Sequence, residues 1–102
     1  MKRIMQTICV QPDKFSDYCA LHDCIWPEIS DAIWQANIRN YSIFHSEGKL
    51  VQYFEYIGSS FAEDMQALSQ SDAMQAWCAV CKTMQIPSTG QWTDMEEVFH
   101  LE

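Results

Sequence analysis

Two kinds of hydrophobic periodicity alternate along this 102-residue chain, and their order limits the folds open to it. Residues 2–10 carry apolar side chains on one parity, which predicts a β-strand. Residues 39–45 and 50–57 predict two more strands, and the acidic, glycine-containing turn at 46–49 predicts that they form an antiparallel hairpin. The alternation at 95–101 predicts a final strand.

The segments between these strands have the spacing of helices. Phe15, Tyr18, Cys19 and His22 follow the i, i+3, i+4, i+7 rule, so they share one helix face. Proline lacks an N–H and disfavours helix in the residue before it, so Pro27 predicts a break. We expect the first helix to end near His22 and a second to begin near Pro27.

The second half of the chain repeats this division. Ser60 and Glu63 have the spacing of a capping box, which predicts that a helix starts there. A further helix is expected from about Asp72. Its apolar stripe would comprise Met74, Trp77, Cys78 and Cys81.

The order of elements is therefore β-α-β-β-α-β, with both helical regions divided in two. This order predicts an α+β fold of the ferredoxin-like type, an antiparallel sheet with helices on one face. The length predicts one domain over residues 1–102. The uncovered sheet face is expected to be too apolar for water, so a homodimer that packs two such faces together is predicted. The residues expected on that face are Tyr41, Ile43, Val51, Tyr53 and Val98.

Charge and composition exclude several classes of partner. Fourteen acidic and six basic residues give a formal charge of −8, which repels nucleic acid and anionic membrane surfaces but not a neutral small molecule. No apolar run approaches the roughly 18 residues that a membrane helix needs. The five cysteines are an odd number in a chain without a recognisable export signal, which favours reduced thiols and a cytoplasmic location.

The sequence HDCIWPE at 22–28 holds the strongest candidate for chemistry. His22 lies at the predicted helix break, one turn after Tyr18 and on the same face, so both side chains could reach one small ligand. The alternative is a neutral imidazole packed at a helix end. For His45 and His100, at predicted strand ends, a solvated or structurally bonded imidazole is the better interpretation.

The sequence CAVC at 78–81 has the spacing of metal or redox ligands. A structural zinc site needs four ligands, and no second pair of this kind exists. Because both cysteines fall on the predicted helical stripe, we interpret them as small core residues and predict no metal. Glycine-rich phosphate loops, nucleophile elbows and metalloprotease motifs are missing too, so no cofactor is predicted.

Trp77 and two glutamates are further candidates for binding. An aromatic ring near a loop can form the floor of a sugar pocket, while polar groups bind the hydroxyls. Glu55 and Glu97 lie among strand residues, where a solvated or paired carboxylate is the default interpretation.

Taken together, the motifs resemble the L-rhamnose mutarotase family from end to end. The matching residues are Tyr18-x-x-x-His22-x-x-Ile25-Trp26-Pro27-Glu28, Asn40-Tyr41-Ser42-Ile43, Tyr53-Phe54-Glu55, Trp77, and Met95-Glu96-Glu97-Val98-Phe99-His100-Leu101. The resemblance implies a cytoplasmic homodimer of the dimeric α/β-barrel type. It also implies an isomerase that interconverts the α and β anomers of L-rhamnose or, in related chains, L-fucose.

The resemblance assigns roles residue by residue. His22 matches the family's proton donor, and Tyr18, Tyr41 and Trp77 match its substrate-contacting positions. The family usually has two consecutive tryptophans at the last position, whereas here Trp77 is followed by Cys78. Cys78 is therefore expected to reshape one wall of the sugar pocket, which leaves the identity of the sugar open. Acid–base catalysis by His22 needs neither metal nor cofactor.

Two alternative functions share the predicted fold. One is a non-catalytic dimeric barrel that binds a small metabolite, and the other is a cofactor-free monooxygenase. Fold alone does not separate them. Tyr18, His22 and Tyr41 favour a polyol ligand, whereas a largely apolar pocket would favour the oxygenase.

Overall fold

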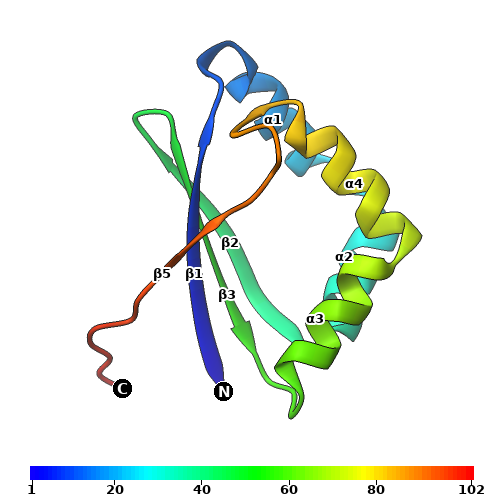
Figure 1. The fold of residues 1–102 in the computed structure, drawn as a ribbon, viewed down its shortest axis with the longest axis vertical. Helices are drawn as coiled ribbons and strands as arrows, with labels where there is room; N and C mark the ends of the chain where they lie inside the picture. The colour runs from blue at the N-terminus through cyan, green and yellow to red at the C-terminus, as the bar shows by residue number, and fades with distance from the viewer.

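The computed structural model describes residues 1–102 as an antiparallel sheet with all its long helices on one face (Figure 1). The helices and strands are β1 (Lys2–Val10), a 3-10 turn η1 (Pro12–Lys14), α1 (Phe15–Asp23), α2 (Pro27–Gln35), β2 (Ile38–Ser46), β3 (Lys49–Tyr56), α3 (Phe61–Gln70), α4 (Asp72–Lys82), β4 (Gln85–Ile86) and β5 (Thr93–Met95). The predicted order of elements and the predicted α+β, ferredoxin-like class are confirmed.

The sheet is ordered β2-β3-β1-β4, and β5 also pairs with β1, so the last strand is split into two short pieces. The strand predicted at 95–101 is wrong, because regular pairing stops at Met95 and Val98, Phe99 and Leu101 are at least 78% exposed. In the β5 register Met5 pairs with Met95. Since β1 begins at Lys2, a strand continued beyond about Val98 would have no partner.

The hairpin between β2 and β3 forms as predicted. Glu47 and Gly48 both have positive φ (50° and 79°), the combination that a two-residue type I′ turn requires. Ser46 therefore pairs with Lys49, and each residue from Ser42 to Ser46 faces a residue of opposite parity on β3.

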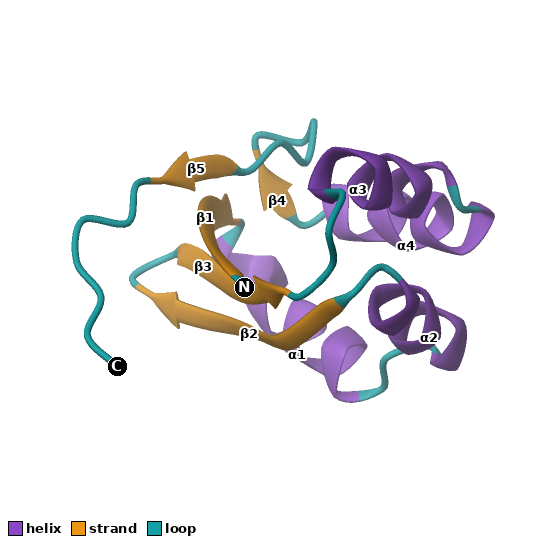
Figure 2. Cartoon of the chain, turned by 90° about the horizontal axis from the view of Figure 1, so that it is seen from below, coloured by secondary structure: helices purple, strands orange, loops and turns teal.

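This parity corrects the residue set proposed for the uncovered face. Ile43 pairs with the buried Gln52, so Ile43 and Tyr41 lie toward the helices, whereas Val51 and Tyr53 lie on the other side. Each strand alternates as predicted, but near the turn the inward residues of β2 are odd-numbered and those of β3 are even-numbered. The uncovered face, which has no helix over it in Figure 2, instead carries Met5, Val51, Tyr53 and Met95.

The helix break occurs where it was predicted. α1 ends at Asp23, and Pro27 is the first residue of α2, a position where its missing N–H costs nothing. Ser60 does precede α3, but its side chain makes no capping hydrogen bond, so the predicted capping box is not formed. No helix is long and apolar enough to cross a bilayer, the longest having 11 residues.

The hydrophobic core fills the space between the sheet and the helices. Its main cluster joins Val10 and Leu50 from the sheet to Ile29 of α2 and Cys81 of α4. Ile29 is fully buried, so its truncation to Ala should cost about 2–5 kcal/mol. This core holds the helices at a fixed distance from the strands.

Candidate active site

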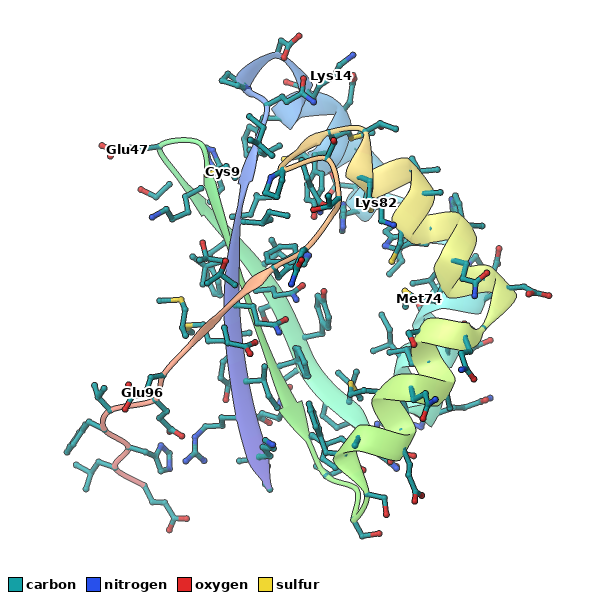
Figure 3. All side chains as sticks on the ribbon, viewed as in Figure 1. Cys9, Lys14, Glu47, Met74, Lys82 and Glu96 are labelled. Carbon is teal, nitrogen blue, oxygen red and sulfur yellow. The ribbon has the colours of Figure 1, made fainter.

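A cavity of about 1220 Å³ opens between the inner face of the sheet and the helices. In Figure 3 side chains project into this space from both layers, while Glu96 lies outside it on the segment that leaves the sheet. All five residues predicted for the site line this one cavity: Tyr18, His22, Tyr41, Trp77 and Cys78. They come from α1, β2 and α4, elements far apart in the sequence.

His22 lies in the last turn of α1, half-buried at the cavity wall. Its Nδ1 is 2.8 Å from the backbone carbonyl oxygen of Tyr18. A carbonyl oxygen only accepts, so Nδ1 carries the hydrogen and Nε2 keeps its lone pair when the ring is neutral. The helix backbone thus fixes one tautomer, and the nitrogen that faces away from it makes no hydrogen bond to the protein.

Aromatic rings hold the imidazole in place. It stacks on Tyr18 at a centroid distance of 4.3 Å and meets Trp77 edge-on at 5.1 Å. Trp77 in turn meets Trp26 edge-on at 5.0 Å. Trp77 lies within α4, as its place on the predicted apolar stripe indicates, and it is only 7% exposed while its ring lines the cavity.

Tyr18 is buried, and its hydroxyl oxygen accepts a hydrogen bond from Gln85 Nε2 at 3.3 Å. Burial raises the pKa of Tyr18 to about 12, and the bond from Gln85 opposes that rise because it favours the phenolate. The phenol therefore stays neutral near pH 7, and its own proton has no acceptor in the protein.

Tyr41 lines the cavity from a β-bulge in β2. Arg39 pairs with Glu55 and Ser42 with Tyr53, so Asn40 and Tyr41 together oppose the single residue Phe54. Asn40 adopts φ 52° and donates from Nδ2 to Glu55 Oε1 at 2.7 Å. The extra residue changes the parity of β2, so that Ile38 and Tyr41 both lie on the inner face. The Tyr41 ring stacks on Phe54 at a centroid distance of 5.7 Å.

The hydroxyl of Tyr41 donates to Oε1 of the buried Gln52. Although the residue as a whole is 40% exposed, its hydroxyl is enclosed, and this burial raises the pKa of Tyr41. The phenol of Tyr18 and the thiols of Cys81 and Cys78 add to the effect, which places these groups close together around the cavity.

The two cysteines of α4 lie where the helical stripe predicts. Cys81 belongs to the hydrophobic core, and Cys78 is half-buried at the cavity wall. Burial raises the pKa of Cys78 and, to about 12, that of Cys81, so both thiols are protonated at neutral pH. No cluster of three or more potential metal ligands is formed.

The default interpretations hold for the two glutamates. Glu55 accepts from Asn40 and Tyr53, and Glu97 pairs with Arg3 at 2.8 Å. Neither glutamate lines the cavity. His45 stacks on Phe15 beside the hairpin turn, and His100 is exposed on the C-terminal segment.

Three glutamines of the site were missed from the sequence. Gln6, Gln52 and Gln85 line the cavity and bond to one another or to the tyrosines. A signal was present, because Gln6 and Gln52 interrupt the apolar inward-facing parity of β1 and β3. A polar side chain at such a position needs a buried partner or a ligand.

The chain is similar in sequence to known proteins. A family model described as L-rhamnose mutarotase matches residues 3–101. Proteins named L-rhamnose mutarotase from Bacillus subtilis (strain 168) and Oceanobacillus iheyensis are 31% and 30% identical, each over the full length of both chains.

Solved structures show the same fold. The crystal structure of an L-rhamnose mutarotase from Formosa agariphila matches with a TM-score of 0.83 and 20% identity, covering all of both chains. An antibiotic biosynthesis monooxygenase matches with a TM-score of 0.63 and 13% identity, over 96% of this chain and 99% of its own. At these identities the structural likeness speaks for the fold alone.

Proposed function

Because the chain belongs to the L-rhamnose mutarotase family, we propose that it interconverts the α and β anomers of a 6-deoxy-L-hexose, L-rhamnose or L-fucose. The observation that carries the proposal is His22, whose Nδ1 is tied to the Tyr18 carbonyl while Nε2 is free beside a cavity. Mutarotation requires one group that exchanges a proton with the sugar, and an imidazole is suited to that near neutral pH.

The proposed reaction opens and recloses the sugar ring. His22 Nε2 exchanges a proton with the sugar while a second group exchanges the other, so that O1 loses a proton as the ring oxygen gains one. The C1–O5 bond breaks, C1 becomes an aldehyde, and no electrons leave the sugar. After the carbonyl turns over, the same steps in reverse close the ring on its other face.

Binding of the sugar would use the rings and hydroxyls around His22. Trp77 offers an aromatic ring, and Tyr18 and Tyr41 offer hydroxyls, which suits a ligand with both C–H and O–H groups. Cys78 stands where the family usually has a second tryptophan, so we propose that it enlarges one wall and affects which sugar is preferred.

We also propose a homodimer and a cytoplasmic location. The sheet face opposite the helices has no element over it (Figures 1 and 2). The strand register places Met5, Val51, Tyr53 and Met95 on this face. Packing two such faces together would remove their apolar surface from water. All five cysteines are free, and three of them are exposed, which supports a reducing compartment.

Saturation-transfer NMR tests the activity directly, because it measures anomer exchange without a coupled enzyme. Wild-type protein should speed the exchange of L-rhamnose, L-fucose or both above the buffer rate. Cys78→Trp should change the ratio of the two rates, since it refills the wall that we consider enlarged. Rates equal to those in buffer for both sugars would refute the proposal, and binding without exchange would point to a metabolite-binding barrel.

A further inference from the structure

A row of hydrogen-bonded polar side chains crosses four strands at one level of the sheet. Gln52 of β3 donates from Nε2 to Gln6 Oε1 of β1 at 2.7 Å. Gln6 donates from Nε2 to Asp94 Oδ1 of β5 at 2.7 Å. At the other end, the Tyr41 hydroxyl of β2 donates to Gln52 Oε1. The strand register supports the row, because Gln6 is the direct partner of both Gln52 and Asp94.

Every hydrogen bond in this row donates in the direction that Asp94 determines. An ionised carboxylate only accepts hydrogen bonds, so Gln6 must turn its NH2 group toward Asp94 and its oxygen toward Gln52. Gln52 must then turn its NH2 group toward Gln6 and its oxygen toward Tyr41. The only group left to donate to that oxygen is the Tyr41 hydroxyl. Its proton is thereby committed to the protein, and its oxygen lone pairs remain for a ligand.

The Tyr18 hydroxyl has the opposite donor and acceptor roles. Its oxygen accepts from Gln85 Nε2, and its proton is bonded to no protein atom. The two phenols line the same cavity on either side of the inner space, one from α1 and one from β2. One phenol offers an acceptor and the other a donor.

We propose that Asp94, Gln6 and Gln52 are positioning residues that act through Tyr41 and make its hydroxyl oxygen accept a hydrogen bond from one sugar hydroxyl. Tyr18 donates its proton to another oxygen of the same sugar. This inference rests on the proposed function, because it names how that cavity distinguishes donors from acceptors on the sugar. A site with a fixed acceptor binds poorly to a sugar whose group opposite that acceptor cannot donate a hydrogen bond.

A row that served stability alone would not couple Gln52 to the recognition of a sugar hydroxyl. Gln52 is buried, so an unpaired amide there would cost stability whatever the ligand. Only the positioning role couples Gln52 to Tyr41 and to the chemistry of one sugar hydroxyl. The test therefore measures that coupling rather than activity alone.

The first experiment is a double-mutant cycle of Gln52→Met and Tyr41→Phe, read by anomer exchange of L-rhamnose. Methionine has a similar volume but offers no comparable acceptor, so the Tyr41 proton is released. Gln52→Met should lower kcat/KM about tenfold or more in the wild-type background and less than about twofold in the Tyr41→Phe background. Equal losses in both backgrounds would overturn the inference.

A series of L-rhamnose analogues with fluorine in place of one hydroxyl at C2, C3 or C4 gives the readout for polarity. Fluorine accepts weakly and never donates. Wild-type protein should bind one analogue at least about tenfold more weakly than L-rhamnose, as measured by tryptophan fluorescence. In Gln52→Met this ratio of the two affinities should be at least about threefold smaller. Discrimination that is the same in both proteins would contradict the assigned direction.

Asp94 tests the outer end of the row and serves if Gln52→Met does not fold, because Asp94 is exposed. Asp94→Leu removes the acceptor and should lower kcat/KM threefold or more. Asp94→Asn should restore most of the activity, since its Oδ1 can still accept from Gln6. Glu96→Leu, two residues further on the same exposed segment, is the matched control and should stay within twofold. Equal effects of Asp94→Leu and Glu96→Leu would overturn the role of Asp94.

The two hypotheses fail in distinguishable ways. Wild-type protein that neither binds nor exchanges L-rhamnose or L-fucose would refute the proposed function and this inference together. An active wild-type protein without coupling between Gln52 and Tyr41 would refute this inference and leave the proposed function intact.

Discussion

At the scale of single residues, the site is defined by which atoms already have partners. His22 Nδ1 is bonded to a backbone carbonyl, the Tyr41 proton to Gln52, and the Tyr18 oxygen to Gln85. The groups left over are a basic nitrogen, a hydroxyl oxygen and a hydroxyl proton. These are the donors and acceptors that a neutral polyol can use.

The raised pKa of Tyr18 predicts how stability changes in alkali. The folded pKa of about 12 lies above the unfolded value of about 10, so burial of the neutral phenol stabilises the fold fully below about pH 10. That contribution is lost as pH rises through about 12. Tyr18→Phe should therefore lose less thermal stability than wild-type protein between about pH 9.5 and 11.5, measured by circular dichroism. Equal losses of thermal stability in the two proteins would show that Tyr18 has the same pKa in the folded and the unfolded state.

At the scale of elements, the bulge in β2 lies directly at Tyr41, the tyrosine that the sheet contributes to the site. Asn tolerates the left-handed conformation, whereas a β-branched residue there is strained by about 1–2 kcal/mol. Asn40→Val should therefore strain the bulge, displace the neighbouring Tyr41 from Gln52 and lower the exchange rate about tenfold or more. Asn40→Gly keeps the backbone conformation and should retain activity within about threefold.

Two measurements separate these effects. Chemical denaturation should show that both variants lose some stability, because both lack the bond from Asn40 to Glu55. Anomer exchange should fall sharply only for Asn40→Val. Similar activity in the two variants would mean that the bulge does not position Tyr41.

The sequence was informative where local rules decide the structure. Pro27 marked the helix break, Glu47 and Gly48 the hairpin turn, and period-2 alternation the three long strands. His22 and Tyr18 were brought together by one turn of helix, which spacing alone predicts. The motif match then named the remaining candidates, and the structure places all of them around one cavity.

The features that the sequence did not reveal depend on pairing between strands. A bulge at Asn40 shifts the register by one residue, and no rule of alternation within β2 anticipates it. The row of hydrogen-bonded side chains that includes Gln6, Gln52 and Asp94 needs three strands in register. The tail beyond about Val98 has the alternation of a strand but no partner along β1, which only the topology shows.

At the scale of the whole molecule, the helices cover one face of the sheet and leave the other bare (Figure 2). The bare face joins apolar residues of three strands to a tail whose Val98, Phe99 and Leu101 are exposed. Such a surface is expected to pack against a second copy.

Light scattering tests the proposed dimer. Wild-type protein at micromolar concentration should have twice the 11.9 kDa mass of one chain. Met5→Glu places a charge at the centre of the bare face and should give monomers, while Gln66→Glu on the outside of α3 is the matched control and should leave the mass unchanged. A wild-type monomer would contradict the proposal.

The central claim is that His22 transfers a proton to and from a deoxy-sugar in this cavity, and saturation-transfer NMR on His22→Ala tests it most directly. If the imidazole carries the proton, the variant should lose about 10²-fold or more of the enzymatic exchange rate. It should still bind L-rhamnose, as followed by tryptophan fluorescence, because Trp77 and both tyrosines remain. A His22→Ala protein that keeps the wild-type exchange rate would contradict the account, whatever its affinity for the sugar.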